Sequence, residues 1–288
     1  MSIYFTITKY MMNLVSSIFI ILIVFTWIWS LPLLIVCALF LMPIAVTFLP
    51  ISILISLFIQ KHYPVTTRSR LRTLVSSLQL HKWFPCNIIE IRQQMLIAVH
   101  PHGLLCCGAL AGIHFAPGST TILCVAPSLF YIPILGWTLH LLGCIPANYN
   151  SMLHVLKQGQ SLIVVPGGVP EIVMAEMGKD SFLYPRYGFL NLAKMVSVPI
   201  LAVFVKGECS TFSFCRLPFL KQRISLSWWF NIPLVFPYFW GHWGMWIPKK
   251  VPLKLYTSLM NKVPSRNEYR VRLASLMLQN QNVIYNPN

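Results

Sequence analysis

The chain has 288 residues, of which 56% are hydrophobic and only 10% charged, and its 22 Lys and Arg face six Asp and Glu, giving a formal net charge of +16. An ordinary soluble domain carries about 25% charged residues, and a disordered basic tail would lack so many large apolar side chains, so both classes are excluded. The cations are not arranged as in a nucleic-acid groove, and attraction to anionic lipid headgroups explains them better. We expect a membrane-associated protein with a folded core that binds no nucleic acid.

The N-terminal region is uncharged over a long run. Tyr10–Gln60 contains no Lys, Arg, Asp, Glu or His over 51 residues. One membrane crossing needs about 20 residues of helix, so the run is long enough for two. Prolines interrupt it, and we predict a membrane-anchoring segment 1–60 that holds a helical hairpin at 11–29 and 33–59. One crossing plus a re-entrant segment is the alternative.

Basic residues flank this run and orient it. Lys9 precedes it, and Lys61, Arg68, Arg70 and Arg72 follow, which predicts that both ends lie in the cytosol. The run is far too long for the core of a cleaved signal peptide. The eight cysteines form no CxxC pair, so we interpret them as reduced, small apolar residues and predict no metal site.

Segment 61–288 is expected to form one α/β domain. Proline and glycine cut its apolar sequence into short pieces typical of buried strands, and two segments between them have helix-like spacing. This alternation predicts a mainly parallel sheet covered by helices. The expected strands are Met95–Val99, Thr120–Val125, Leu162–Val165 and Pro199–Val205, and the expected helices are Ser151–Gln158 and Gly188–Met195.

Nine aromatic residues lie between Trp228 and Trp246 without an acid or a basic Lys or Arg. Amphipathic rings suit the depth of lipid headgroups, so this segment is interpreted as a lip at the membrane interface. An aromatic cluster in the protein core is the alternative.

The tetrapeptide His100-Pro101-His102-Gly103 follows the first expected strand. Ligands bind at the carboxyl ends of strands in open α/β sheets. In an extended backbone residues i and i+2 point the same way, so the two imidazoles are expected to share one face of a pocket. A neutral imidazole is the commonest general base near neutral pH, although a His pair is also found in structural positions and metal sites.

Two further motifs follow expected strands or begin an expected helix. In Pro166–Glu171, the pair Gly167 and Gly168 exposes backbone N–H groups suited to a phosphate or an oxyanion, and Glu171 could orient a histidine, bind a hydroxyl or cap a helix. Arg186, before Gly188, suits an anionic group such as a coenzyme phosphate, with an ion-paired or membrane-facing arginine as the alternative.

Common nucleophile and phosphate motifs are absent from the sequence. It contains no G-x-S-x-G elbow, no G-x-x-x-x-G-K-[ST] loop and no H-E-x-x-H. Cys106 and Cys107 lie close to the two histidines, but nothing in the sequence marks either as an activated thiolate.

Taken in order, these motifs resemble the type 2 diacylglycerol acyltransferase family, which includes monoacylglycerol and wax-alcohol acyltransferases. The matching blocks span most of the chain, from the hairpin to about Pro252. They are Trp83-Phe84-Pro85, His100–Gly103, Pro166–Glu171, Arg186 with Gly188 and Phe189, Gly207-Glu208, and Trp243-Gly244 to Pro252.

The sequence also departs from the family pattern. The usual Arg is missing from Pro146-Ala147-Asn148-Tyr149, and the Val-Gly-x-Pro motif near the C-terminus is not recognisable around Tyr256. No acid stands four residues after His100 or His102, which argues against the glycerol-phosphate branch of the wider acyltransferase superfamily. These departures leave the acceptor alcohol open.

The resemblance implies an acyl-CoA-dependent O-acyltransferase with a glycerolipid-acyltransferase-like sheet. A fatty acyl group would pass to the hydroxyl of a neutral lipid, most simply diacylglycerol or monoacylglycerol. His102 is expected to be the general base, His100 to orient it and Glu171 to fix the base or the acceptor. Five residues are expected at the oxyanion or acyl-CoA site: Gly103, Gly167, Gly168, Arg186 and Gly188.

The resemblance also implies partners and a location. Acyl-CoA and the neutral-lipid acceptor are the expected ligands, no cofactor is expected to be permanently bound, and oligomerisation stays open. The expected location is the endoplasmic reticulum membrane as a multi-pass protein with a cytosolic catalytic domain, or a lipid droplet. A wax-alcohol acyltransferase and a catalytically silent lipid-binding protein of the same fold are the alternatives.

Overall fold

The computed structural model describes most of the domain that follows the N-terminal run. The described residues are 50–55, 58, 70–132, 135–175, 186–215, 218–230, 239–245 and 247–278. The predicted hairpin lies almost entirely outside these ranges, and so does the predicted domain boundary after residue 60. Within them, no helix has both the length and the apolar character needed to cross a bilayer.

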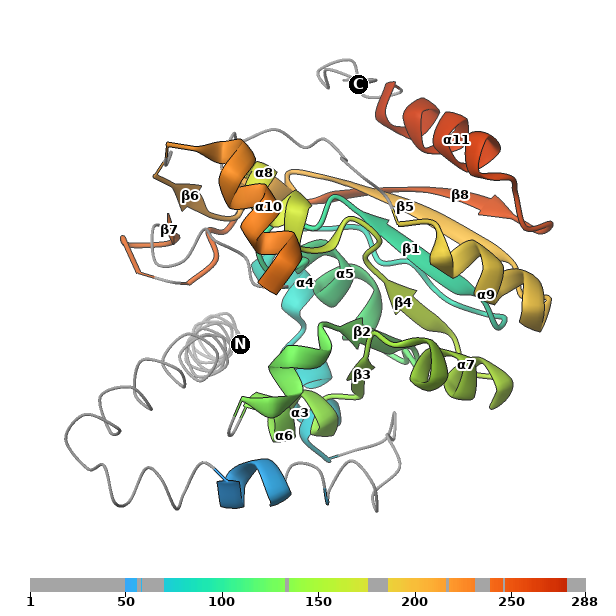
Figure 1. The fold of residues 1–288 in the computed structure, drawn as a ribbon, viewed down its shortest axis with the longest axis horizontal. Helices are drawn as coiled ribbons and strands as arrows, with labels where there is room; N and C mark the ends of the chain where they lie inside the picture. The colour runs from blue at the N-terminus through green and yellow to red at the C-terminus, as the bar shows by residue number, and fades with distance from the viewer. Residues whose placement is uncertain are drawn as a thin grey trace, which may run out of the picture.

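The centre of the fold is a six-stranded sheet of order β3-β2-β4-β1-β5-β8 (Figure 1). The first five strands in this order run parallel, and β8 pairs antiparallel with β5 at one edge. This confirms the predicted α/β fold with a mainly parallel sheet. The strands are β1 (Leu96–His100), β2 (Ile122–Val125), β3 (Cys144–Pro146), β4 (Leu162–Val164), β5 (Ile200–Lys206) and β8 (Lys254–Met260).

Helices cover both faces of this sheet. On one face lie α3 (Arg70–Ser77), α4 (Leu80–Trp83), α5 (Cys107–Ala109) with the π-helical turn Leu110–His114, and α6 (Leu135–Leu141). On the other lie α7 (Tyr149–Lys157), α9 (Gly188–Val196) and α11 (Arg266–Leu278). The remaining elements are 3-10 turns at Pro127–Tyr131 and Glu208–Ser210, α8 (Gly168–Ala175), α10 (Leu220–Phe230) and the small pair β6 (Ser213–Phe214) and β7 (Phe239–Trp240).

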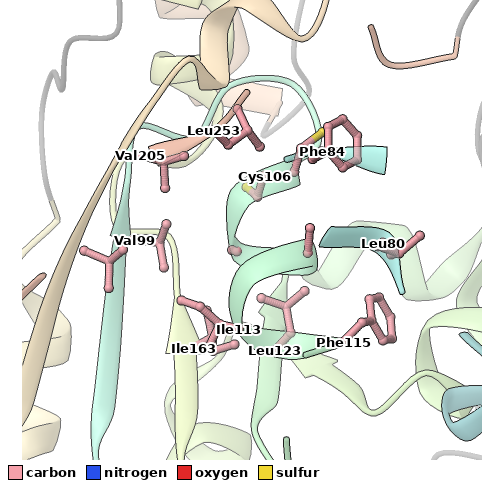
Figure 2. Close-up of a cluster of buried hydrophobic side chains, with 14 of the residues drawn as sticks. Leu80, Phe84, Val99, Cys106, Ile113, Phe115, Leu123, Ile163, Val205 and Leu253 are labelled. Carbon is pink, nitrogen blue, oxygen red and sulfur yellow. The ribbon is translucent and has the colours of Figure 1, made fainter. Parts of the chain in front are cut away.

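Alternation along β1 divides the core into two layers. Ile97 and Val99 face the layer that contains α5, where Figure 2 shows Val99 among the side chains of the cluster. Leu96 and Ala98 face the layer of α7, α9 and α11. All five residues of β1 are buried, as a central strand covered on both faces requires.

The four strands predicted from short apolar runs are observed as β1, β2, β4 and β5, and the two predicted helices as α7 and α9. The strands β3 and β8 and the helix α11 were not predicted. β3 has only three residues, and β8 has an irregular, half-exposed pattern at the sheet edge, so neither carries a strong apolar signal.

The two interpretations of the aromatic segment each hold for different residues. Trp229, Trp240 and Trp243 are exposed, with Trp229 at 81%, whereas Phe239 is buried in the core. The exposed rings agree with an interface lip, and the buried one belongs to an aromatic cluster with Phe212 and Phe214.

Candidate active site

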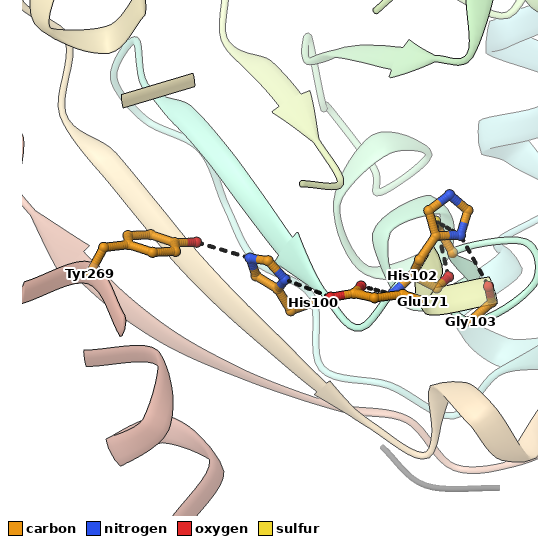
Figure 3. Close-up of polar contacts among 6 residues, drawn as sticks. His100, His102, Gly103, Glu171 and Tyr269 are labelled. Atoms are coloured by element: carbon orange, nitrogen blue, oxygen red, sulfur yellow. Dashed lines mark hydrogen bonds and ion pairs between the residues drawn. The ribbon is translucent and has the colours of Figure 1, made fainter. Parts of the chain in front are cut away.

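His100 is the last residue of β1 and lies wholly inside the protein. Its side chain is on the same face as Leu96 and Ala98, toward α11. His100 Nε2 lies 3.1 Å from the Tyr269 hydroxyl, and His100 Nδ1 lies 3.6 Å from Glu171 Oε1 (Figure 3). Each ring nitrogen of His100 therefore faces a polar group of another residue, and the side chain is fully buried.

Glu171 reaches His100 because the preceding turn has no side chain in its path. The carboxylate folds back from the first turn of α8 against Gly167, where a Cβ atom would lie 1.7 Å from Glu171 Cδ. Glu171 is 2% exposed. Its Oε2 accepts the backbone N–H of His102 at 2.8 Å, so a single carboxylate contacts both histidines of the motif.

His102 is half-buried, and its ring is oriented by the next residue. Its Nδ1 lies 3.0 Å from the Gly103 carbonyl oxygen. A carbonyl oxygen only accepts, so Nδ1 carries the proton and the basic lone pair is on Nε2. Burial lowers the pKa of His102 below its usual value, and the Gly103 carbonyl and the Glu171 carboxylate partly offset this. The imidazole is therefore neutral at pH 7.

The expectation that the two imidazoles share one face is wrong. Figure 3 shows the rings of His100 and His102 on opposite sides of Glu171. The strand ends at His100, and His102 lies beyond it, so the alternation of an extended strand does not continue to His102. Only the half-buried His102 ring remains a candidate for contact with a substrate.

A second buried acid, Glu208, binds the backbone of the segment that follows Gly103. Its two oxygens accept the N–H groups of Cys107 and Gly108 at 2.7 and 2.8 Å, at the start of α5. Gly103 has φ +55°, and a Cβ atom there would lie 2.7 Å from Glu208 Cγ. Glycine at 103 is thus required by both its backbone conformation and the approach of Glu208.

The thiols near His102 are not suited to nucleophilic attack. Cys106 Sγ lies 3.5 Å from His102 Nδ1, but burial raises the pKa of both Cys106 and Cys107 well above the usual value. Both thiols are therefore protonated at neutral pH. Within the described ranges, no three His, Cys, Asp or Glu residues are grouped as metal ligands.

The other expected site residues lie around the Pro166–Gly168 turn or at the start of α9. Gly168 N–H already donates to the Val165 carbonyl at 3.2 Å within the turn. The exposed Arg186 is tied to the same turn, because its backbone N–H donates to the Pro166 carbonyl at 3.2 Å. A Cβ atom at Gly188 would meet only open space.

Tyr269 belongs to the site and was not predicted from the sequence. It lies on α11, 169 positions after His100, in a helix without a recognisable motif. Its ring packs against Phe189 at a centroid distance of 5.2 Å and against Tyr187 at 6.4 Å. These two partners belong to the Arg-Tyr-Gly-Phe block, so that block encloses Tyr269.

The part of the chain that holds the site motifs lies within the range that a known family model matches. The family model "Diacylglycerol acyltransferase" matches residues 39–250. Human 2-acylglycerol O-acyltransferase 3 is 25% identical over 223 residues, which cover 65% of this chain and 62% of the human protein. Mouse diacylglycerol O-acyltransferase 2-like protein 6 is 31% identical over 150 residues, which cover 46% of this chain and 44% of the mouse protein.

The chain thus spans about half to three fifths of the length of these relatives. A solved structure, that of the 1-acyl-sn-glycerophosphate acyltransferase of Thermotoga maritima, covers 81% of this chain and 95% of its own with a TM-score of 0.42 and 15% identity. The family model alone matches well over half of the chain and includes every residue of the buried site except Tyr269. The chain therefore belongs to the diacylglycerol acyltransferase family.

Proposed function

We propose that this protein is a membrane-bound O-acyltransferase that moves a fatty acyl group from acyl-CoA to the hydroxyl of a neutral lipid, diacylglycerol or monoacylglycerol. The single observation that carries the proposal is the orientation of His102. Its Nδ1–H is held by the Gly103 carbonyl, so Nε2 is left as a base on a half-buried ring. A base fixed in one tautomer with a lowered pKa suits the removal of a proton from an alcohol at neutral pH.

The proposed reaction needs one proton carrier and no resident cofactor. The acceptor oxygen attacks the thioester carbonyl while His102 Nε2 takes the hydroxyl proton. The tetrahedral intermediate then expels the CoA thiolate, which receives that proton from His102, so the base is regenerated. Gly168 N–H is already bonded to Val165, and we therefore assign the Gly167 N–H as the donor to the oxyanion.

Arg186 is the residue that we propose for the coenzyme. It is exposed beside the Pro166–Gly168 turn, and an arginine fork suits a phosphate. The open space at Gly188 leaves room for a ligand at the start of α9. A coenzyme bound along this edge would bring its thioester toward the turn that holds Glu171.

We also propose that the protein works at the endoplasmic reticulum membrane, with the domain in the cytosol, or at a lipid droplet. Three exposed tryptophans of the segment from Trp228 to Trp246, namely Trp229, Trp240 and Trp243, support contact with a lipid surface. Residues 209–267 contain basic side chains and no acid, which favours an anionic surface.

The proposal is tested by incubating membranes that contain the full-length chain with labelled acyl-CoA and a panel of acceptors. The panel contains 2-monoacylglycerol, 1,2-diacylglycerol, a long-chain alcohol and lysophosphatidate. Labelled diacylglycerol formed from the monoacylglycerol, or labelled triacylglycerol formed from the diacylglycerol, supports the proposal. Ester formed only on the long-chain alcohol would indicate a wax-alcohol acyltransferase, and lipid binding without consumption of thioester would indicate a silent relative.

The role of His102 is tested by the His102→Ala variant. Loss of the general base should lower kcat at least about a hundredfold while the membrane content of the protein is unchanged. His154→Ala is the matched control, since His154 is an exposed histidine on α7 and should retain full activity. Activity of His102→Ala within a fewfold of the parent would remove His102 from the mechanism.

A further inference from the structure

We propose that Tyr269 is a positioning residue for acyl transfer, which acts on the base through His100 and Glu171. The inference rests on the proposed function for its kinetic consequences. It stands on a chain of contacts that joins α11 to the His102 loop and crosses the end of the sheet (Figure 3).

One arrangement of protons suits every contact along this chain, and we assign it to the site. The Glu171 carboxylate faces His100 Nδ1 at 3.6 Å and can only accept, so a proton on Nδ1 suits this contact. His100 Nε2 then needs a donor, and the Tyr269 hydroxyl provides it at 3.1 Å. The second oxygen of Glu171 is left to accept the N–H of His102.

The surroundings of Tyr269 keep its hydroxyl protonated, so that it can donate a hydrogen bond to His100. Its side chain is fully buried, and burial with the nearby Glu171 charge raises the pKa of its phenol well above the usual value. The ring is enclosed at near-perpendicular angles by Phe189, at 72°, and Tyr187, at 84°. The hydroxyl is therefore both protonated and held in place by rings that the Arg-Tyr-Gly-Phe block provides.

The same contacts explain why the hydroxyl should matter for catalysis. Without it, a buried His100 Nε2 would lose its donor, and a proton on Nε2 would leave a lone pair on Nδ1 facing the carboxylate. Glu171 would then move away from His100. Because the same carboxylate holds the backbone of His102, the base would lose its position.

The test is Tyr269→Phe in the full-length chain, because phenylalanine keeps the ring contacts and deletes only the hydroxyl. We expect kcat to fall about tenfold, as for the loss of one buried hydrogen bond, with KM for acyl-CoA within twofold of the parent. Tyr256→Phe, on the half-buried edge strand β8, is the matched control and should leave both constants unchanged.

A double-variant cycle separates positioning from general stability. Glu171→Ala removes the group that links His100 to His102, so if Tyr269 acts through Glu171, the Tyr269→Phe, Glu171→Ala pair should be no slower than Glu171→Ala alone, within twofold. Multiplied losses in the pair, or a Tyr269→Phe enzyme with parental kcat, would overturn the inference.

The tautomer of His100 gives a readout that does not depend on activity. In solubilised protein labelled with 15N-histidine, long-range 1H–15N spectra distinguish the two ring tautomers, and a His100→Gln sample identifies the His100 signals. We expect Nδ1–H in the parent and Nε2–H in Tyr269→Phe. An unchanged tautomer overturns the role of Tyr269, whereas a parent that transfers no acyl group overturns the proposed function and leaves the tautomer result standing.

Discussion

Glu171 combines two tasks in one side chain, and its charge also acts on the base. It holds the backbone of His102 and faces His100, and it is buried, so its field on the imidazole is only weakly screened. The carboxylate raises the pKa of His102 against the larger effect of burial, which lowers it. The charge of Glu171 therefore helps to set the pH at which the proposed base becomes neutral.

Glu171→Gln should move the acid limb of kcat/KM to lower pH. The glutamine carbonyl can still accept the His102 N–H, but the negative charge is lost, so the pKa of His102 falls further. A base is active when it is deprotonated, and a lower pKa therefore extends activity toward acid. The check is kcat/KM between pH 5 and 8, with the exposed Glu268→Gln as control. A limb that stays in place or moves upward contradicts the electrostatic role.

The sequence could place His102 and Glu171 at strand ends, but not their mutual geometry. Both follow buried strands whose carboxyl ends meet at one edge of a parallel sheet, which is a local signal. The sides on which the two histidines lie depend on how the backbone turns after β1. Tyr269 had no signal, because its contact with His100 joins residues 169 positions apart.

At the level of elements, the connection from β1 to α5 is held by two buried acids. Glu171 accepts the first N–H of this connection at His102, and Glu208 accepts those of Cys107 and Gly108. Glu208 follows Gly207, whose φ of +94° turns the chain at the end of β5. The Gly-Glu block thus has a structural purpose that its position in the sequence did not distinguish from ligand binding.

Glu208→Gln should destabilise the fold by about 2 kcal/mol, because an amide NH2 replaces one oxygen that accepts a buried backbone N–H. For a domain of this size this corresponds to a fall in Tm of roughly 4–8 °C. Glu268→Gln is the matched control, since Glu268 accepts the exposed Ser265 N–H at 2.9 Å and glutamine can do the same. Equal melting temperatures for the two variants would show that the buried contacts of Glu208 do not stabilise the fold.

The strands that the sequence predicts are buried on both faces. β1, β4 and β5 are continuous apolar runs because helices cover both of their faces. β8 carries exposed residues such as Lys254 and Leu259 between buried ones and resembles a surface segment. The apolar pattern predicted the middle of the sheet together with α7 and α9, the polar residues after the strands indicated the candidate site, and the resemblance to a family gave those residues their expected roles.

On the scale of the whole molecule, this basic protein buries one of its histidines beside an arginine. His114 is fully buried; its Nε2–H donates to the Leu142 carbonyl at 3.0 Å, and its own carbonyl accepts from Arg72 Nη2 at 3.0 Å. Burial lowers the pKa of Arg72 to about 10, so this guanidinium is still charged at neutral pH. Burial and then the Arg72 charge hold the pKa of His114 well below its usual range.

The free energy of unfolding should therefore fall as the pH drops below about 6.5. In this range His114 and His102 become protonated in the unfolded chain, whereas their lowered pKa values keep them neutral in the folded protein. Each such proton costs up to about 1.4 kcal/mol per pH unit until the folded pKa is reached. His114→Gln should keep the donor to Leu142 and flatten this slope, whereas the exposed His154→Gln should not. The measurement is Tm between pH 7.5 and 5. A His114→Gln variant with the parental slope would show that other groups cause the acid sensitivity.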